Sequence, residues 1–296
     1  MAHRSPDLRR SLIFVAGADA VAQDQALGAR PDVLIQDLED FTPRPLKETG
    51  RSRAAALFAA CRQAGAMAAV RIDRLADGGL LDLDAVVPAR PDLILLPKAE
   101  SAAEIAALDA AIGTREALHG LEPGTIEIVP TVETARGVLR LEAIVSASAR
   151  IRSAVLGAED LAADLMAPRT REGGELAYAR ARFLLECRAL GIEPVDPPYT
   201  FADEAGCASE ARRAAAAGYR SKSTVTPGHV AILHAVFSPD ADALRHAQNV
   251  VAAFDEARAR GADRVLVDGL WIEPPTYRRA CALIERAEAL AAASAA

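Results

Sequence analysis

Short apolar runs alternate with longer stretches of helix-like spacing along most of the chain. Strands that are buried on both faces of a parallel sheet are continuously apolar, so these runs predict strands. The predicted strands are Ser11–Gly17, Asp32–Asp40, Ala66–Asp73, Asp92–Glu100, Ile126–Glu133, Ile151–Asp160, Glu193–Thr200 and Tyr219–Thr226. The stretches between them, such as Ser101–Ile112 and Leu176–Leu190, predict helices.

The alternation of strands and helices predicts an α/β fold. Eight strands, each followed by a helix, match the count of a (β/α)₈ TIM barrel. An open doubly wound sheet is the alternative, but residues Phe14–Asp19 lack the three-glycine spacing of a dinucleotide-binding loop. We therefore expect a (β/α)₈ barrel in residues 1–236.

Residues 237–296 are expected to form a C-terminal helical extension. Pro239–Arg260 and Pro274–Ala293 have the pattern of amphipathic helices, and Arg264–Gly269 between them is a short apolar run. The barrel does not require these apolar faces. We expect the extension to be a lid, a contact with a neighbouring subunit, or both.

Composition narrows the range of functions. The chain has 296 residues, 51% of them hydrophobic, which is enough for one barrel with a large core. The net charge of −7 disfavours a nucleic-acid surface. No apolar run approaches the ~20 residues that a membrane span needs, and we expect no signal peptide. We expect a cytoplasmic protein.

The cysteines and histidines give no sign of a metal cluster or of nucleophilic hydrolysis. The four cysteines are dispersed, which is typical of reduced thiols in the cytosol. We expect His229 and His234 on the surface of a helix. No Ser-His-Asp or Cys-His arrangement stands out.

Two carboxylates close successive predicted strands, Glu133 the fifth and Asp160 the sixth. The carboxyl ends of parallel strands meet at the edge where α/β folds hold their active sites. Each acid alone could be a helix N-terminal residue that favours the helix dipole. As a pair, they predict an oxygen-rich site for a hard divalent cation.

Further charged and polar residues occur at the predicted strand ends. They are Asp37, Glu39, Asp40, Arg71, Asp73, Lys98, Glu100, Glu159, Asp196, Lys222 and Thr226. So many carboxylates facing one opening would repel one another unless cations lay among them. A site that holds Mg²⁺ and Arg71 meets this requirement.

Arg71 and Lys98 each have a structural alternative. Arg71 could be a structural ion-pair partner. Lys98 could be a Schiff-base nucleophile. We favour a salt bridge from Lys98 to Glu100 or Asp40.

Several segments have the form of motifs known from one enzyme family. They are Arg10–Gly17, Asp37–Asp40, Val70–Asp73, Leu96–Glu100, Glu133–Gly137 and Gly157–Asp164. The last two are the most specific. Together they resemble the citrate lyase β-subunit and malyl-CoA lyase family of Mg²⁺-dependent TIM-barrel aldolases, in the HpcH/HpaI aldolase superfamily. The resemblance covers nearly the whole chain.

The resemblance implies a role for each of these residues. Glu133 and Asp160 would ligate Mg²⁺, with Mn²⁺ as an alternative, and Arg71 would stabilise the enolate that carbon–carbon cleavage creates. The expected catalytic residues are Arg71, Asp40 and Glu273; the expected substrate-binding residues are Arg71, Glu133, Arg10 and Phe14; the expected supporting residues are Asp37, Glu39 and Lys98.

Two segments depart from the family pattern. The family's tail carries an aspartate that is offered to a neighbouring subunit, and here Glu273 occupies that position, next to Trp271. After the eighth strand the family has Ile-His-Pro, whereas this chain has Val225-Thr226-Pro227-Gly228-His229. The second departure concerns the part of the site that would receive a thioester such as CoA.

The leading hypothesis is a Mg²⁺-dependent carbon–carbon lyase that acts on a small hydroxy or oxo diacid, as the free acid or as its CoA thioester. The alternatives are a Schiff-base aldolase that uses Lys98, and an accessory subunit that binds a keto acid or an acyl carrier. A thioesterase outcome stays open within the family. We expect a homotrimer or hexamer, with no nucleic-acid or membrane partner.

Overall fold

The computed structural model describes residues 4–295 of the chain. These residues form two compact units, divided between His234 and Ala235. The boundary expected from the sequence, between residues 236 and 237, falls inside helix α10 (His229–Phe237).

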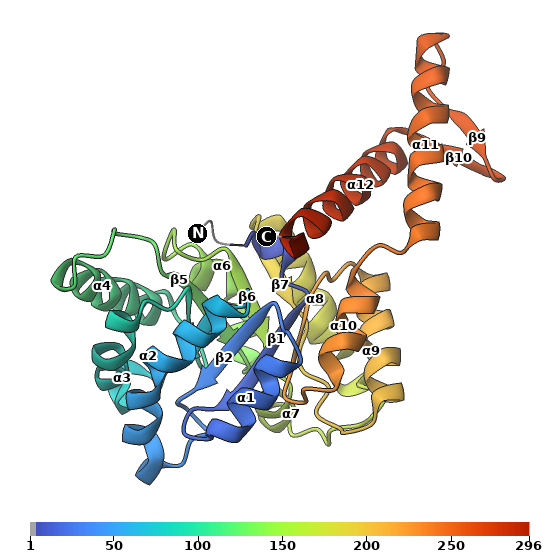
Figure 1. Cartoon of the computed structure of the whole chain (residues 1–296). Helices are drawn as coiled ribbons and strands as arrows, with labels where there is room; N and C mark the ends of the chain where they lie inside the picture. Colours follow the sequence, from blue (N-terminus) through green and yellow to red (C-terminus); the bar gives the residue numbers. More distant parts are fainter. Residues whose placement is uncertain (1–3, 296) are drawn as a thin grey trace. The chain divides into compact units, whose positions relative to one another are not determined.

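The first unit is a parallel barrel of eight strands (Figure 1). The strands are β1 (Ser11–Ala16), β2 (Val33–Asp37), β3 (Met67–Arg71), β4 (Leu93–Leu96), β5 (Glu127–Val132), β6 (Ser153–Leu156), β7 (Glu193–Val195) and β8 (Lys222–Thr224). Each strand from β1 to β7 pairs with the next, and β8 pairs with β1. A parallel bridge between Asp196 and Lys222 closes the ring, so the open sheet is excluded and the predicted TIM barrel is confirmed.

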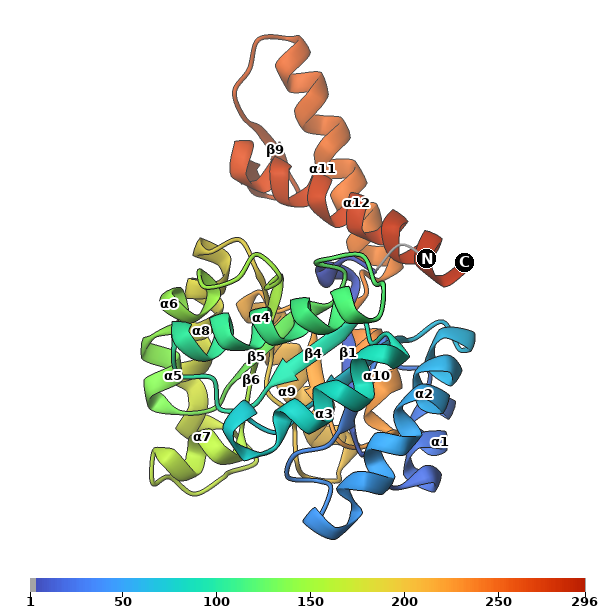
Figure 2. The same ribbon diagram turned by 90° about the vertical axis from the view of Figure 1, so that its left-hand side faces the viewer.

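Helices follow the strands and cover the outside of the barrel (Figure 2). They are α1 (Ala20–Gly28), α2 (Lys47–Gln63), α3 (Gly79–Val86), α4 (Ala102–Leu118), α5 (Ala135–Leu139), α6 (Leu141–Val145), α7 (Glu159–Asp164), α8 (Ala177–Ala189), α9 (Glu204–Ala217) and α10. Several begin at a residue whose side chain accepts a backbone N–H of the first turn, such as Ser101 before α4 and Thr134 before α5.

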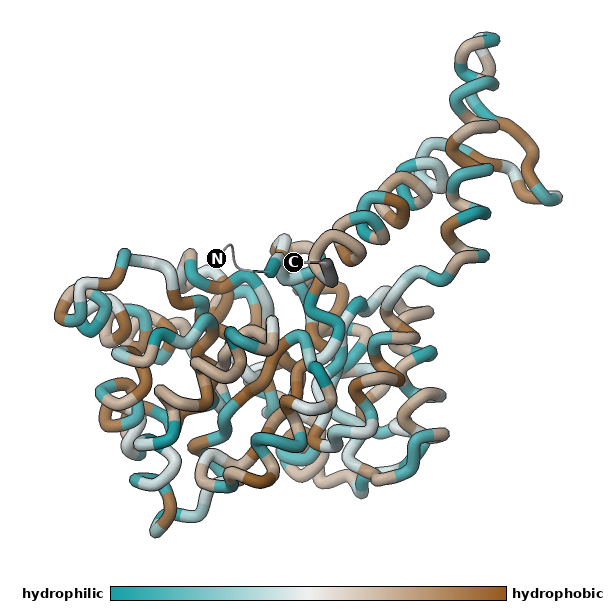
Figure 3. Tube along the Cα trace, viewed as in Figure 1, coloured by the Kyte–Doolittle hydropathy of each residue, from teal (hydrophilic) through white to brown (hydrophobic). Residues whose placement is uncertain are grey.

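Alternation along the strands separates an inner face from an outer face. Side chains at alternate positions form one apolar cluster inside the barrel: Leu12, Phe14, Val33, Ile35, Met67, Ala69, Leu93, Leu95, Val129, Val155 and Val195. Apolar residues at intervening positions, such as Leu34, Ala68 and Ile94, are buried as well, and hydrophobic stretches run through the barrel (Figure 3). The interior is therefore a packed core and not a channel.

An ion pair lies inside the barrel near the N-terminal ends of the strands. Arg9 donates two hydrogen bonds to the carboxylate of Glu127, at 3.0 and 2.8 Å. Ser153 donates a third to Glu127, at 2.7 Å. Arg9 and Glu127 are both buried, so this end of the barrel is closed by paired charges.

The second unit contains two helices and a hairpin. They are α11 (Ala241–Ala259), the antiparallel strands β9 (Val265–Val267) and β10 (Leu270–Ile272), and α12 (Pro274–Ala295). Its small core includes Phe254, whose ring centroid lies 4.8 Å from that of Tyr277. At the hairpin, Leu266, Leu270 and Trp271 stay exposed.

Within residues 4–295, no helix is long and apolar enough to cross a membrane. The four cysteines, Cys61, Cys187, Cys207 and Cys281, are all free thiols.

The Arg9–Glu127 pair gives a prediction for stability. Arg9→Ala would leave the Glu127 carboxylate buried without its partner, and we expect a loss of about 3–5 kcal/mol in the free energy of unfolding. Urea unfolding followed by circular dichroism measures the change. Arg212→Ala on the exposed face of α9 is the control, with an expected change within about 0.5 kcal/mol. Equal effects of the two substitutions would contradict a structural role for the pair.

Candidate active site

Charged side chains replace apolar ones where the strands reach the C-terminal opening of the barrel, which we call the mouth. Asp37 ends β2 and Arg71 ends β3, and the two residues are register partners. Glu133 directly follows β5. All three lie on the inner face of their strands, and all three are buried.

Arg71 is held rigidly at the centre of the mouth. Its Nε donates to Asp37 Oδ1 at 3.1 Å, Nη2 pairs with Asp37 Oδ2, and Nη1 lies 3.1 Å from Glu39 Oε2. The rings of Phe14 and Phe41 lie beside it, with their centroids 5.2 and 5.5 Å from Cζ. Burial alone would lower the pKa of Arg71, but Asp37 and Glu39 raise it, so the guanidinium stays charged.

Glu133 is a buried carboxylate, and within the described residues 4–295 no lysine or arginine forms a salt bridge with it. Its Oε1 accepts a hydrogen bond from the backbone N–H of Lys98, at 2.8 Å. Burial raises the pKa of Glu133 to about 7; Arg71 opposes the rise and Asp160 adds to it. A side chain on Gly157 would meet Glu133 Oε2 at 2.6 Å, so glycine is needed after β6 to leave room for this carboxylate.

Asp160 lies in the first turn of α7 and is half-buried. Its charge acts on both Glu133 and Lys98. Among residues 4–295, no group of three or more histidine, cysteine, aspartate or glutamate side chains could hold a metal ion. A Glu133–Asp160 pair still fits Mg²⁺, because Mg²⁺ in proteins is commonly bound by one or two carboxylates, with waters and substrate completing the shell.

Lys98 links the acids after β2 to Glu133. Its Nζ lies 2.6 Å from Glu39 Oε1 and 3.0 Å from Asp40 Oδ2. Its backbone has a φ of 48°, a conformation uncommon outside glycine, and in this conformation its N–H reaches Glu133. Lys98 therefore pairs with Asp40, one of the two partners expected, and with Glu39. It does not pair with Glu100, which accepts from Thr134 Oγ1 at 2.8 Å.

The charge state of Lys98 argues against a Schiff base. Burial alone would lower its pKa, but the hydrogen bonds to Glu39 and Asp40 raise it. A Schiff-base lysine must lose its proton to attack a carbonyl. Lys98 remains a cation, so the geometry disfavours the Schiff-base alternative.

The expectation that Arg10 binds substrate is wrong. Arg10 directly precedes β1, at the end of the barrel opposite the mouth. Its backbone N–H donates to the carboxylate of Asp32, just before β2, at 2.7 Å. Its guanidinium donates two further hydrogen bonds to the same carboxylate, at 2.9 and 3.0 Å. Phe14, the other expected residue of this strand, does reach the mouth, where it packs against Arg71.

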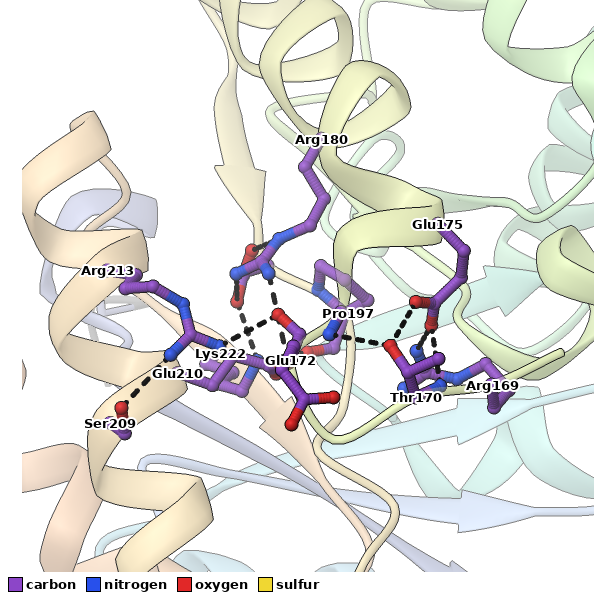
Figure 4. Close-up of polar contacts among 12 residues, drawn as sticks. Arg169, Thr170, Glu172, Glu175, Arg180, Pro197, Ser209, Glu210, Arg213 and Lys222 are labelled. Carbon is purple, nitrogen blue, oxygen red and sulfur yellow. Dashed lines mark hydrogen bonds and ion pairs between the residues drawn. The ribbon is translucent and has the colours of Figure 1, made fainter. Parts of the chain in front are cut away.

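Asp196 and Lys222, which were expected at the strand ends that face the mouth, instead pair with residues of α8 and α9. Figure 4 shows Lys222 beside Glu210 and Arg180. Asp196 and Lys222 both point outward into the layer between the strands and the helices, because they alternate with inner-face residues such as Val195. Lys222 Nζ lies 2.6 Å from Asp196 and 2.5 Å from Glu210 of α9. Arg180 of α8 adds a bidentate pair with Asp196. The cluster joins α8 and α9 to the barrel.

His229 is not a surface residue. Its ring is fully buried and near Tyr199, with the ring centroids 6.0 Å apart, and burial lowers the pKa of His229. Its backbone N–H donates to the carbonyl of Thr226, which fixes the turn after β8. The departure from the family pattern at this turn therefore has a packing role.

The chain matches the family described as HpcH/HpaI aldolase/citrate lyase over residues 10–227. The chain belongs to this family. The match spans all eight strands of the barrel and includes Glu133 and Asp160.

Relatives in the family are similar over almost the whole chain. The citrate lyase subunit beta of Haemophilus influenzae is 34% identical over 283 residues, covering 95% of this chain and 97% of that protein. The L-malyl-CoA/beta-methylmalyl-CoA lyase of Cereibacter sphaeroides is 28% identical over 306 residues, covering 96% of each. They confirm the expected enzyme class, a carbon–carbon lyase of the aldolase type.

Solved structures share the fold. CitE of Mycobacterium tuberculosis, in complex with magnesium, acetoacetate and coenzyme A, has a TM-score of 0.73 and 25% identity, covering 96% of this chain and 98% of that one. A citrate lyase from Burkholderia xenovorans has a TM-score of 0.82 at 19% identity, covering 95% and 92%, and shows the shared fold. Magnesium in the first of these agrees with the cofactor expected from the sequence.

Two mouth residues were missed in the sequence. Phe41 packs beside Arg71, but it lies in a loop where no periodicity marks its direction. Thr131 lies on the inner face of β5, two positions before Glu133, and the signal for it was a polar residue inside an apolar run. Glu273, by contrast, lies in the second unit, where it is exposed at the start of α12.

The raised pKa of Glu133 gives a prediction for the metal-free enzyme. The folded protein keeps a proton on Glu133 that the unfolded chain releases between pH 4.5 and about 7, so stability falls as pH rises through this window. Glu133→Gln removes this effect. In EDTA, we expect the stability of the variant relative to wild type to be higher at pH 8 than at pH 5 by about 2–3 kcal/mol.

Chemical denaturation at the two pH values measures this difference. Glu142→Gln, on the exposed face of α6, is the matched control for the loss of a carboxylate. Mg²⁺ should stabilise wild type at pH 8 and leave Glu133→Gln nearly unchanged. A pH-independent effect of Glu133→Gln would show that the carboxylate is ionised as in water.

Proposed function

We propose that the chain is a Mg²⁺-dependent lyase that breaks or forms a carbon–carbon bond between a 2-oxo acid and an acyl thioester. The observation that carries the proposal is the pairing of Glu133 and Asp160, two carboxylates that repel each other, beside the fixed cation Arg71. Family membership supports the same reaction class.

Glu133 and Asp160 would hold the Mg²⁺ ion. When bound, the ion supplies Lewis-acid polarisation of the substrate's keto oxygen. Glu133 can give up its proton near neutral pH, because its pKa lies at about 7 without a cation. The backbone N–H of Lys98 orients the carboxylate through Oε1 and leaves Oε2 for the ion.

Arg71 would bind the negative charge that develops on the substrate when the bond breaks. Charge fixed in advance is effective in catalysis because it does not have to reorganise during the reaction. Asp37, Glu39 and the two phenylalanine rings provide this fixation, which is the supporting role that we assign to the acids after β2. Asp40, which is exposed and paired with Lys98, would act on water at the rim of the site.

A groove beside Phe41 would accept the rest of the substrate. It has a volume of about 450 Å³, and its lining is mostly apolar, with Asp19 and Thr42 as polar members: Ala16, Ala18, Asp19, Ala20, Val21, Phe41, Thr42, Pro43 and Leu46. Phe41 belongs to both the groove and the packing around Arg71. An acyl thioester arm such as that of CoA would suit this apolar lining. The CoA-bound relative and the malyl-CoA lyase support the thioester over the free acid.

The C-terminal unit would complete the site of a neighbouring copy in a homotrimer or hexamer. Its exposed hairpin residues Leu266, Leu270 and Trp271 offer an apolar surface for the contact. Glu273 directly follows this hairpin and would act as the acid offered to the neighbour. The free thiols of the chain support a cytoplasmic location.

Metal dependence tests the proposal. With Mg²⁺, we expect the enzyme to cleave malyl-CoA or citryl-CoA, and EDTA to abolish turnover. Glu133→Ala and Asp160→Ala should each lower kcat/KM by at least about 10³-fold, because each removes a metal ligand. Glu142→Ala is the control. Full activity of either ligand variant would overturn the metal assignment; binding of oxaloacetate without cleavage of any thioester would favour an accessory subunit.

The trans role of Glu273 has its own test. Glu273→Gln should lower kcat by about 10²-fold or more, the usual scale for losing a general acid, while Mg²⁺ affinity stays unchanged. We expect mixtures of Glu273→Gln and Glu133→Ala, refolded together, to regain activity, since mixed oligomers would contain some intact sites. A mixture as inactive as its parents would place Glu273 in the site of its own chain or outside the chemistry.

A further inference from the structure

Thr131 carries a hydroxyl that bonds to no other group of the protein. The side chain is 2% exposed, and Oγ1 has no hydrogen-bond partner among residues 4–295. The backbone carbonyl of the same residue is satisfied, since it accepts the N–H of Ala99 at 3.1 Å. A buried hydroxyl without a partner is costly and uncommon. The hydroxyl therefore indicates a hydrogen-bond partner that is not part of the chain.

The alternation of β5 places this hydroxyl just below the carboxylates of the mouth. Glu127, Val129, Thr131 and Glu133 share the inner face of the strand. Glu127 pairs with Arg9 near the closed end, and Val129 belongs to the apolar cluster. Glu133 follows at the mouth. Thr131 is thus the polar group where the packed core ends and the site begins.

The surroundings of Thr131 suit an apolar residue equally well. Its register partner on β6 is Val155, a member of the interior cluster. Valine has nearly the shape of threonine, and in the isolated protein it would fill the position without an unpaired polar atom. Core packing alone does not account for the hydroxyl.

We propose that Thr131 is a substrate-binding residue whose hydroxyl donates a hydrogen bond to an oxygen of the bound oxo acid. The inference rests on the proposed function, because it assumes an oxo acid between Glu133 and Arg71. Oxygens of an oxo acid only accept hydrogen bonds, and Thr131 has a free O–H to donate. Nε, Nη1 and Nη2 of Arg71 each already face a carboxylate.

This hydrogen bond would select among oxo acids. A site that pairs a buried polar group with a substrate oxygen discriminates strongly against analogues that leave the group unpaired. The favoured substrate presents a carboxylate or keto oxygen toward the core, at the level of β5. Thioester identity is read elsewhere, since the groove beside Phe41 lies at the loops that follow β1 and β2.

Binding of oxaloacetate in the presence of Mg²⁺, measured by calorimetry on the full chain, tests the role of the hydroxyl. Thr131→Val should raise the Kd by about tenfold or more, and Thr131→Ser, which keeps the hydroxyl, should stay within about threefold of wild type. Without ligand, Thr131→Val should unfold at the same temperature as wild type or higher. A purely structural hydroxyl would give the opposite pattern of destabilisation with unchanged binding.

The outcomes separate this inference from the proposed function. Wild type that binds none of oxaloacetate, pyruvate and acetoacetate with Mg²⁺ would overturn the proposed function, and the role of Thr131 with it. Wild type and Thr131→Val that bind oxaloacetate equally would overturn the role of Thr131 alone. Weaker binding by Thr131→Val, restored in Thr131→Ser, would establish it.

Discussion

The site depends on how negative charge is balanced at the mouth of the barrel. Asp37, Glu39, Asp40, Glu133 and Asp160 gather around the cations Arg71 and Lys98. Asp37 and Glu39 are matched by these cations, which raises the pKa of Arg71 and of Lys98. Glu133 is left over, and it keeps a proton at a pH where a free carboxyl would not. Without a further cation, negative charge at the mouth is not fully balanced. The acids that stabilise Arg71 therefore also favour the binding of a metal ion next to Glu133.

The barrel and most of the mouth could be predicted from the sequence because buried parallel strands leave a strong signal. Each apolar run became a strand, and the carboxylates that close the fifth and sixth runs lie at the mouth, as expected. The wrong predictions concerned the direction in which a side chain points. Asp196 follows an inner-face residue and so points outward, since one step along a strand reverses the face. His229 was placed on a surface because its fully buried environment is built by distant residues such as Tyr199.

Family membership and substrate identity are carried by different parts of the chain. The barrel motifs match over residues 10–227, yet relatives of comparable similarity are named for citrate lyase and for malyl-CoA lyase. The two relatives resemble this chain to a similar degree, so overall similarity does not distinguish between their substrates. In this chain, the positions that differ from the family pattern or border the proposed site, such as Thr131, Phe41 and the turn from Thr226 to His229, are where we would seek the substrate preference.

The closed lower end of the barrel constrains the order of events in catalysis. Arg9 and Glu127 pair at one end, and apolar side chains fill the space above them, whereas Glu133 lies at the opposite end, the mouth. With the oxo acid bound deeper than the thioester, as we propose for Thr131, the oxo acid would arrive first and depart last. In kinetic terms, the enzyme would follow a compulsory sequence in which the oxo acid is the leading substrate of condensation and the final product of cleavage.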